Sequence, residues 1–145
     1  MSLREQYDRD NVFAKIIRGE IPSTKIMETQ SILAIMDAFP QSDGHALVIH
    51  KQAQSTNLLN FPTDSLGTIM ECVQRIARAS EMALAPDGIR IAQFNGAAAG
   101  QTVFHTHFPI IPVYSNAPLG DHASGDAAAS TERLSEIAEK IKAAL

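Results

Sequence analysis

A stretch of helical periodicity in the middle of the chain constrains the fold more than any other feature. From residue 63 to residue 85 the apolar side chains recur every three or four positions, and Thr63 or Asp64 is available as the N-cap. This spacing places the apolar side chains on one stripe of a long amphipathic helix. The stripe consists of Leu66, Ile69, Met70, Val73, Ile76 and Ala77.

Short apolar runs on both sides of this helix predict the strands of a sheet. The Asp43-Gly44 pair and the Pro86-Asp87-Gly88 segment supply turns between them, and a Gly/Ala-rich connection precedes the last run. Five strands are expected, roughly at residues 25–28, 32–37, 45–51, 89–95 and 103–112. The short connections between the first three of these strands favour an antiparallel meander.

Two further helices are expected near the ends of the chain. Asp10 is placed to cap a short helix that carries Val12, Phe13, Ile16 and Ile17 on one side. From Thr131 onward a second amphipathic pattern predicts a C-terminal helix over 131–145, with Leu134, Ile137, Ala138 and Ile141 on one stripe. Together these elements predict an α+β fold.

The length and composition of the chain limit its organisation and its partners. A length of 145 residues suits one domain, 1–145, in which the Gly-, Ala- and Ser-rich segment 115–130 reads as a flexible loop. A net charge of −4 argues against an extended nucleic-acid partner. Without a bilayer-length apolar run or a secretory signal, we expect no membrane partner and a cytoplasmic location. The single cysteine, Cys72, excludes an intramolecular disulfide and a multi-cysteine zinc site.

The stretch from Gly100 to Pro112, GQTVFHTHFPIIP, carries the most chemical information. His105 and His107 lie two residues apart on a predicted strand, so alternation places both rings on one face. A neutral imidazole can attack an electrophile through one nitrogen while the other is held by a hydrogen bond. By itself the pattern is also compatible with a solvated sheet face or a fortuitous metal site.

In this context the sequence resembles the histidine triad family of nucleotide hydrolases and transferases, and most closely its small nucleoside phosphoramidase branch. The resemblance runs from about residue 10 to residue 112, over the blocks NVFAKIIRGEIPSTKI, ILAIMDAFPQSDGHALVIHK and FNGAAAGQTVFHTHFPIIP. It implies an α/β meander core, commonly a homodimer, that holds a purine nucleotide on one sheet face. It also implies that His107 attacks the phosphorus, that His105 supports His107, and that His45 is a further histidine of the site.

The same resemblance implies roles for the residues that would hold the nucleotide. Asp37 would accept hydrogen bonds from the ribose hydroxyls, and Gly100 would let the chain pass close to the phosphate. The phosphate-side polar residues would be Asn95, Gln101 and Thr102. The walls around the base would be Phe13, Ile17 and Ile35 or Met36.

Each of these assignments has a plainer alternative. Taken singly, the apolar residues read as core, Asp37 as the first residue of a turn, and Gln101 and Thr102 as loop polars. His50 should face away from His45 on a regular strand, and His122 reads as a solvated loop residue. Neither His50 nor His122 is assigned a role.

The sequence departs from the family pattern at several positions. Pro109 stands where the family usually has a third histidine, which leaves the proposed nucleophile in place but affects the rate, the leaving-group preference or activity itself. A proline inside a strand also predicts an edge strand or a bulge. His50 stands where relatives generally have proline. Asn11 and Ala14 stand where some bacterial members have zinc-binding cysteines, so no structural zinc is predicted.

Three functional hypotheses follow from these observations. The first is a hydrolase or nucleotidyl transferase that forms a nucleotidyl-His107 intermediate on phosphoramidates, dinucleoside polyphosphates or aminoacyl adenylates, without a metal or other cofactor. The second is a nucleotide-binding module that has lost useful catalysis because of Pro109. The third is a metal-binding protein built on His45, His105 and His107.

Overall fold

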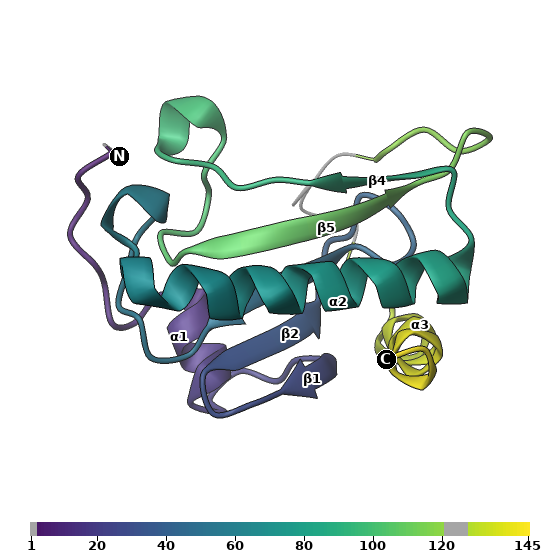
Figure 1. The fold of residues 1–145 in the computed structure, drawn as a ribbon, viewed down its shortest axis with the longest axis horizontal. Helices are drawn as coiled ribbons and strands as arrows, with labels where there is room; N and C mark the ends of the chain where they lie inside the picture. The colour runs from purple at the N-terminus through teal and green to yellow at the C-terminus, as the bar shows by residue number, and fades with distance from the viewer. Residues whose placement is uncertain (1–2, 121–127) are drawn as a thin grey trace.

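The computed structural model describes residues 3–120 and 128–145, and it has the predicted α+β architecture (Figure 1). One antiparallel sheet of five strands has the order β1-β2-β3-β5-β4. The strands are β1 (Lys25–Glu28), β2 (Ile32–Met36), β3 (Ala46–His50), β4 (Gly88–Ile91) and β5 (His107–Val113). The helices are α1 (Val12–Ile17), α2 (Leu66–Leu84) and α3 (Thr131–Ala143). No helix in the described ranges is long and apolar enough to cross a membrane.

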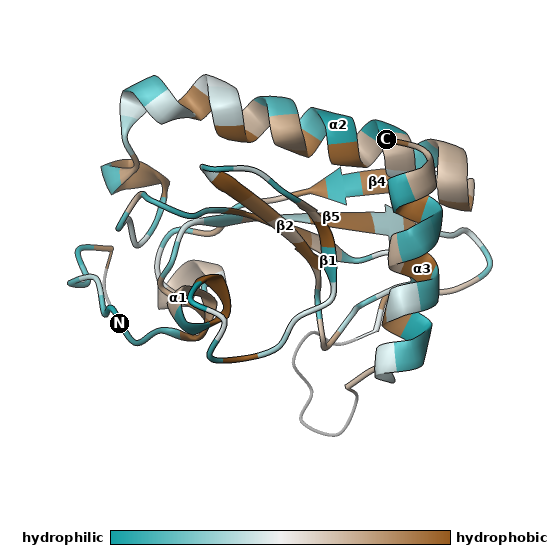
Figure 2. Cartoon of the chain, turned by 90° about the horizontal axis from the view of Figure 1, so that it is seen from below, coloured by the Kyte–Doolittle hydropathy of each residue, from teal (hydrophilic) through white to brown (hydrophobic). Residues whose placement is uncertain are grey.

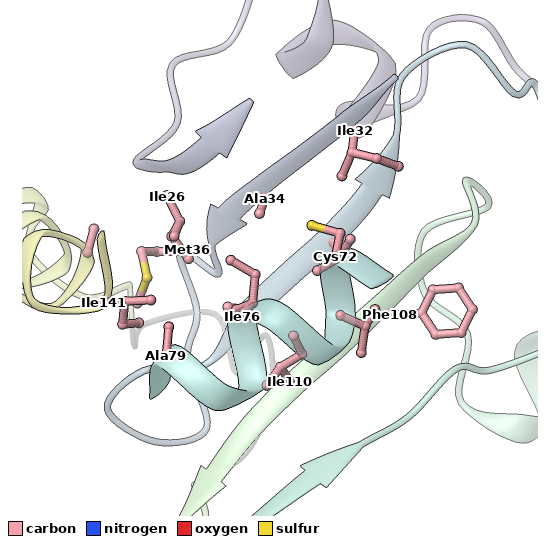
Figure 3. Close-up of a cluster of buried hydrophobic side chains, with 14 of the residues drawn as sticks. Ile26, Ile32, Ala34, Met36, Cys72, Ile76, Ala79, Phe108, Ile110 and Ile141 are labelled. Atoms are coloured by element: carbon pink, nitrogen blue, oxygen red, sulfur yellow. The ribbon is translucent and has the colours of Figure 1, made fainter. Parts of the chain in front are cut away.

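The two faces of the sheet are covered by different helices, as Figure 2 shows, with α2 and α1 on opposite sides. Strand alternation sends Ala34 and Ile110 toward α2, where they lie in one core with Ile76 (Figure 3). Val48 and Ile69 belong to the same larger core. The other face carries a smaller cluster of Phe13, Leu33, Ile35, Leu47 and Ile49. This smaller cluster lies under α1 and leaves part of its sheet face available for a site.

The long helix begins later than predicted and ends as a left-handed turn. Residues 63–65 form a 3₁₀ turn, so neither Thr63 nor Asp64 is the N-cap, and Ser65 at that position makes no capping hydrogen bond. Ala85 ends the helix with φ of 48°. Of the predicted stripe, Ile69, Val73 and Ile76 are buried, Leu66 and Ala77 are partly buried, and Met70 is 42% exposed.

The two terminal helices differ in how well the sequence predicted them. At α1 the cap is Asn11, whose side chain accepts the Ala14 N–H, and not Asp10, which forms an ion pair with Arg18. At α3 the predicted stripe is confirmed, since Leu134, Ile137, Ala138 and Ile141 are buried. Of the predicted loop 115–130, residues 121–127, including His122, lie outside the described residues. Gly120 is bonded to Gln41 through two hydrogen bonds.

Pro109 lies in β5, an interior strand, so the prediction of an edge position is wrong. In an antiparallel strand the N–H and C=O of one residue point toward the same neighbour. The Pro109 carbonyl accepts the Ala92 N–H at 3.2 Å, so its missing N–H also faces that side, beyond the end of β4 at Ile91. The ladder to β3 therefore loses no hydrogen bond. The same geometry accounts for β4 ending at Ile91 and not at Asn95.

Candidate active site

The loop between β4 and β5 has a backbone that requires glycine and a buried amide that holds it. Gly96 and Gly100 have φ of 90° and 104°, a region that other residues rarely adopt. The Gln101 side chain, 4% exposed, accepts the Gly96 N–H at 2.8 Å. It donates to the carbonyls of Thr56 and Val103. Gln101 borders the site, but its side-chain amide is hydrogen-bonded to backbone groups of the protein. The geometry therefore does not favour the predicted contact between this amide and a phosphate.

His107 is the first residue of β5, and its ring orientation is set by a short hydrogen bond. Its Nδ1 lies 2.6 Å from the His105 carbonyl oxygen. A carbonyl can only accept, so Nδ1 carries the proton and Nε2 of the neutral ring carries the lone pair. The edge of Phe13 packs against the ring at a centroid distance of 4.8 Å. The ring is therefore held in one orientation, with its lone pair on Nε2.

His105 does not share a strand face with His107, because β5 begins only at His107. Its side chain is 2% exposed, and Nε2 donates to the His50 carbonyl at 3.0 Å. The Tyr7 hydroxyl lies 2.8 Å from Nδ1. Burial lowers the pKa of His105 to about 4, so its ring is neutral at neutral pH. His105 thus contacts His107 through its backbone carbonyl, while its ring anchors the loop from behind.

His50, to which no role was assigned, faces the other way from His45 as predicted. Its Nδ1 accepts the N–H groups of Gln52 and Ala53, and its ring packs edge-on against Phe61 of the larger core. Burial lowers the pKa of His50. The ring therefore fixes the chain just after β3, next to the carbonyl that holds His105.

A cavity of about 200 Å³ lies in front of His107. It brings together residues that the sequence predicted from four separate segments, namely Phe13, Asp37, His45, Gly100, Gln101, Thr102 and His107. Pro109 borders the same cavity, two residues beyond His107 on the same side of β5. The position of the family's third histidine is therefore at the site, occupied by a side chain with no donor.

Asp37 and His45 form a buried pair at the edge of this cavity. Asp37 Oδ2 lies 3.5 Å from His45 Nε2, and the side chains are 6% and 1% exposed. Asp37 Oδ1 also accepts the Phe39 N–H at 2.8 Å. Asp37 therefore also begins a turn, which was the plainer alternative for this residue. His45 Nδ1 accepts the Gln41 N–H at 3.0 Å. The pair is thereby oriented by the turn that follows β2.

A larger cavity of about 580 Å³ adjoins the first and shares Asp37, Leu47 and Thr102 with it. Its walls are mainly apolar and come from α1, the segment before β1, β2 and the start of α3. Its volume lies in the range usual for small-molecule sites. The carboxylate at the junction and the apolar walls beyond it suit a sugar and a planar base.

Three of the predicted nucleotide-binding residues are placed differently from the expectation. On α1 it is Ile16, not Ile17, that lines the larger cavity, and Ile17 lines a separate depression with Arg18. Ile35 lies on the cavity side, whereas Met36 belongs to the core beneath α2 and only borders the cavity. Asn95 does not border either cavity, and its Oδ1 accepts the Leu58 N–H. A one-residue shift on a six-residue helix changes the face, which explains the error at Ile17.

The far wall of the larger cavity was not predicted from the sequence; it is formed by Ala128, Ala129, Thr131 and Leu134. The Ala129 N–H donates to the Ala38 carbonyl at 3.0 Å. Arg133 forms an ion pair with Asp43 at 2.6 Å. These contacts join the C-terminal segment to the turn after β2, a long-range arrangement for which the local sequence carries no signal.

The histidines do not converge as a metal site would require. Both ring nitrogens of His105 are bonded within the protein, and His45 faces Asp37. Over residues 3–120 and 128–145 there is no group of three or more His, Cys, Asp or Glu side chains placed to hold an ion. The hypothesis of a metal-binding protein on His45, His105 and His107 therefore has no geometric support.

Comparison with known proteins agrees with this geometry. The family model described as the HIT domain matches residues 18–116. The chain belongs to the HIT family. A solved structure of a HIT-like protein from Bartonella henselae is 46% identical, covers 96% of this chain and 99% of its own, and has a TM-score of 0.87. The HIT domain match ends before the C-terminal wall and begins after α1.

Several relatives of this HIT protein have enzymatic names, among them the following two. An adenosine 5′-monophosphoramidase of Schizosaccharomyces pombe is 38% identical over 101 residues, which cover 70% of this chain and 72% of that protein. An adenylylsulfatase of Arabidopsis thaliana is 43% identical over 103 residues, which cover 71% of this chain and 52% of that protein. The chain is therefore similar to hydrolases as well as to HIT proteins in general.

Proposed function

We propose that this HIT protein is a nucleotide hydrolase or nucleotidyl transferase that acts at the α-phosphate of purine nucleoside phosphoramidates or dinucleoside polyphosphates. One observation carries the proposal: the 2.6 Å hydrogen bond from His107 Nδ1–H to the His105 carbonyl, which leaves the lone pair on Nε2 beside a nucleotide-sized pair of cavities. The enzymatic names of the two relatives support the adenylyl group as the common part of the substrate.

The proposed reaction has two displacement steps. In the first, His107 Nε2 forms a bond to the α-phosphorus, and the P–N or P–O bond to the leaving group breaks. The leaving group departs with the electron pair of that bond. When the leaving group is an amine, it takes a proton from solvent. The ring becomes cationic, and the His105 carbonyl stabilises it through the retained Nδ1 proton. In the second step water attacks phosphorus, the Nε2–P bond breaks, the nucleoside monophosphate leaves, and the water proton passes to solvent.

The two cavities suggest how the nucleotide would lie. The α-phosphate would occupy the 200 Å³ cavity beside His107, near Gly100 and the exposed Thr102. The ribose hydroxyls would meet Asp37 at the junction, and the base would enter the 580 Å³ cavity between Phe13 and Ile35. His45 would orient Asp37. No cofactor takes part in this scheme.

Pro109 supports a second candidate function, a nucleotide-binding module without useful turnover. Its side chain borders the same cavity as His107 and offers no proton donor to a leaving group. Binding would then persist through Asp37 and the apolar walls, while chemistry is slow. The experiment below separates the two functions.

The test is AMP release from adenosine 5′-phosphoramidate and from a dinucleoside tetraphosphate, beside a His107→Ala control, with AMP binding measured by calorimetry. The proposal predicts AMP release by the natural protein, no release by His107→Ala, and AMP binding by both. Equal release by both proteins would refute the role of His107. AMP binding without turnover of either substrate would favour the binding module.

The assembly and location of the protein remain proposals of the same kind. β4 is an edge strand, and Ile91 on it is 46% exposed, which fits a homodimer joined along this edge. Light scattering that gives a monomer mass would contradict the dimer.

A cytoplasmic location is proposed as well, and cell fractionation tests it. With a net charge of −4, no binding to extended nucleic acid is expected in a gel-shift assay.

A further inference from the structure

Tyr7 lies in the segment before α1, and it contacts the loop behind the candidate nucleophile. Its hydroxyl is 2.8 Å from His105 Nδ1, and the two rings pack at a centroid distance of 5.5 Å with an interplanar angle of 55°. Tyr7 is half-buried and borders neither of the two nucleotide cavities. It also lies outside the matched HIT domain, which begins at residue 18. The hydroxyl of Tyr7 therefore contacts the site through His105.

The proton positions around His105 follow from the partners of its ring. Nε2 is 3.0 Å from the His50 carbonyl, which can only accept, so Nε2 carries the proton of the neutral ring. Nδ1 then carries a lone pair, and the Tyr7 hydroxyl must be the donor to it. Burial, which lowers the pKa of His105 to about 4, keeps the ring in this neutral state near neutral pH. The His50 carbonyl thus selects the tautomer of His105, and the Tyr7 hydroxyl holds the ring from its opposite nitrogen.

The same residue, His105, holds His107 through its backbone. Its carbonyl accepts the His107 Nδ1–H at 2.6 Å, and that bond determines which nitrogen of His107 is nucleophilic. Two hydrogen bonds to its ring, from Tyr7 and to His50, fix the rotation of residue 105 and so the direction of its carbonyl. A hydrogen-bonded support of this kind orients a reactive group without touching the substrate.

We propose that Tyr7 is a positioning residue for His107, and that its hydroxyl acts by fixing the orientation of His105. This inference rests on the proposed function, because His107 must be the nucleophile for its orientation to affect turnover. The rest of the N-terminal segment has its own attachments, since Asn57 Nδ2 donates to the Leu3 carbonyl and Leu3 packs against Gly96. Removing the Tyr7 hydroxyl alone therefore leaves the segment attached.

The test compares Tyr7→Phe with Tyr114→Phe in the full chain. Tyr114 is the only other tyrosine, and its hydroxyl also makes one 2.8 Å hydrogen bond, to the Asp43 carbonyl, away from His107. Imidazole ¹⁵N chemical shifts report the tautomers of His105 and His107, and steady-state kinetics on adenosine 5′-phosphoramidate report kcat and KM. Thermal unfolding of both variants measures the stability lost with each hydroxyl.

The proposal predicts that Tyr7→Phe weakens the hydrogen bond from His107 Nδ1 to the His105 carbonyl, seen as a shift of the His107 Nδ1 signal. It also predicts that kcat falls about five- to tenfold, as expected for the loss of one oriented hydrogen bond, with KM within about twofold. Tyr114→Phe should leave both the ¹⁵N signals and kcat unchanged. An unchanged His107 Nδ1 signal in Tyr7→Phe would overturn the proposal, whether or not kcat falls. If the natural protein releases no AMP, the proposed function fails, while the ¹⁵N spectra still decide whether Tyr7 fixes His105.

Discussion

Replacing Gln101 with alanine should loosen the loop that positions His107. The Gln101 amide makes three hydrogen bonds in a nearly dry environment, to the Gly96 N–H and to the Thr56 and Val103 carbonyls. At roughly 1 kcal/mol for each bond, Gln101→Ala should lower the free energy of unfolding by about 3 kcal/mol. For a domain of this size that corresponds to a fall in Tm of about 10 °C. Turnover should fall with it, because Gly96 would no longer be held.

One further variant of Gln101 and one control variant test this interpretation. Gln101→Glu keeps the acceptor for the Gly96 N–H but, when ionised, cannot donate to the two carbonyls, so it should destabilise the protein at least as much as alanine. Gln74→Ala is the matched control, since Gln74 is exposed on α2 and its loss should change Tm by no more than about 2 °C. Thermal unfolding and kcat for AMP release are the measurements. A Gln101→Ala protein with the Tm and kcat of the natural protein would refute this reasoning.

Three more predictions concern the site. Pro109→His should raise kcat for the phosphoramidate, whose amine leaving group needs a proton, more than for adenylyl sulfate; equal effects in a two-substrate assay would contradict this. Ala129→Trp should fill the far end of the 580 Å³ cavity and weaken AMP binding at least tenfold by calorimetry, with Tm nearly unchanged. Because burial lowers the pKa of His105 to about 4, its neutral ring contributes stability at pH 7 that is lost as pH falls from about 6.5 toward 4. The loss should be on the order of 3 kcal/mol in urea unfolding, and a His105→Gln protein should show a flatter profile over that range.

The periodicity of the sequence predicted most of the fold because buried stripes leave a local pattern. The α2 stripe around Val73 and the α3 stripe around Ile137 both repeat at helical spacing, and both pack on the sheet. Element ends were less predictable. Where β5 starts depends on pairing with β3, so the sequence could not show that His105 precedes the strand while His107 begins it. Because β5 starts at His107, the His105 ring does not share a strand face with the His107 ring. The two residues are joined instead through the His105 backbone carbonyl.

The candidate site was predictable only where the family resemblance supplied positions. Asp37, His45 and His107 do meet at one cavity, although they come from distant parts of the chain. The amide of Gln101 and the wall at Ala129 were not predictable, because their partners are set by the tertiary fold and leave no spacing rule in the sequence.

The central claim is that His107 carries the nucleotide during turnover, and direct detection of that adduct tests it best. Protein mixed with excess adenosine 5′-phosphoramidate would be quenched within milliseconds in alkaline denaturant, which preserves a phosphorus–imidazole bond, and then analysed by peptide mass spectrometry. The account predicts an adenylyl group on the peptide that contains His107, absent from the His107→Ala protein. An adduct on a different residue, or rapid AMP release with no adduct at any time point, would contradict it.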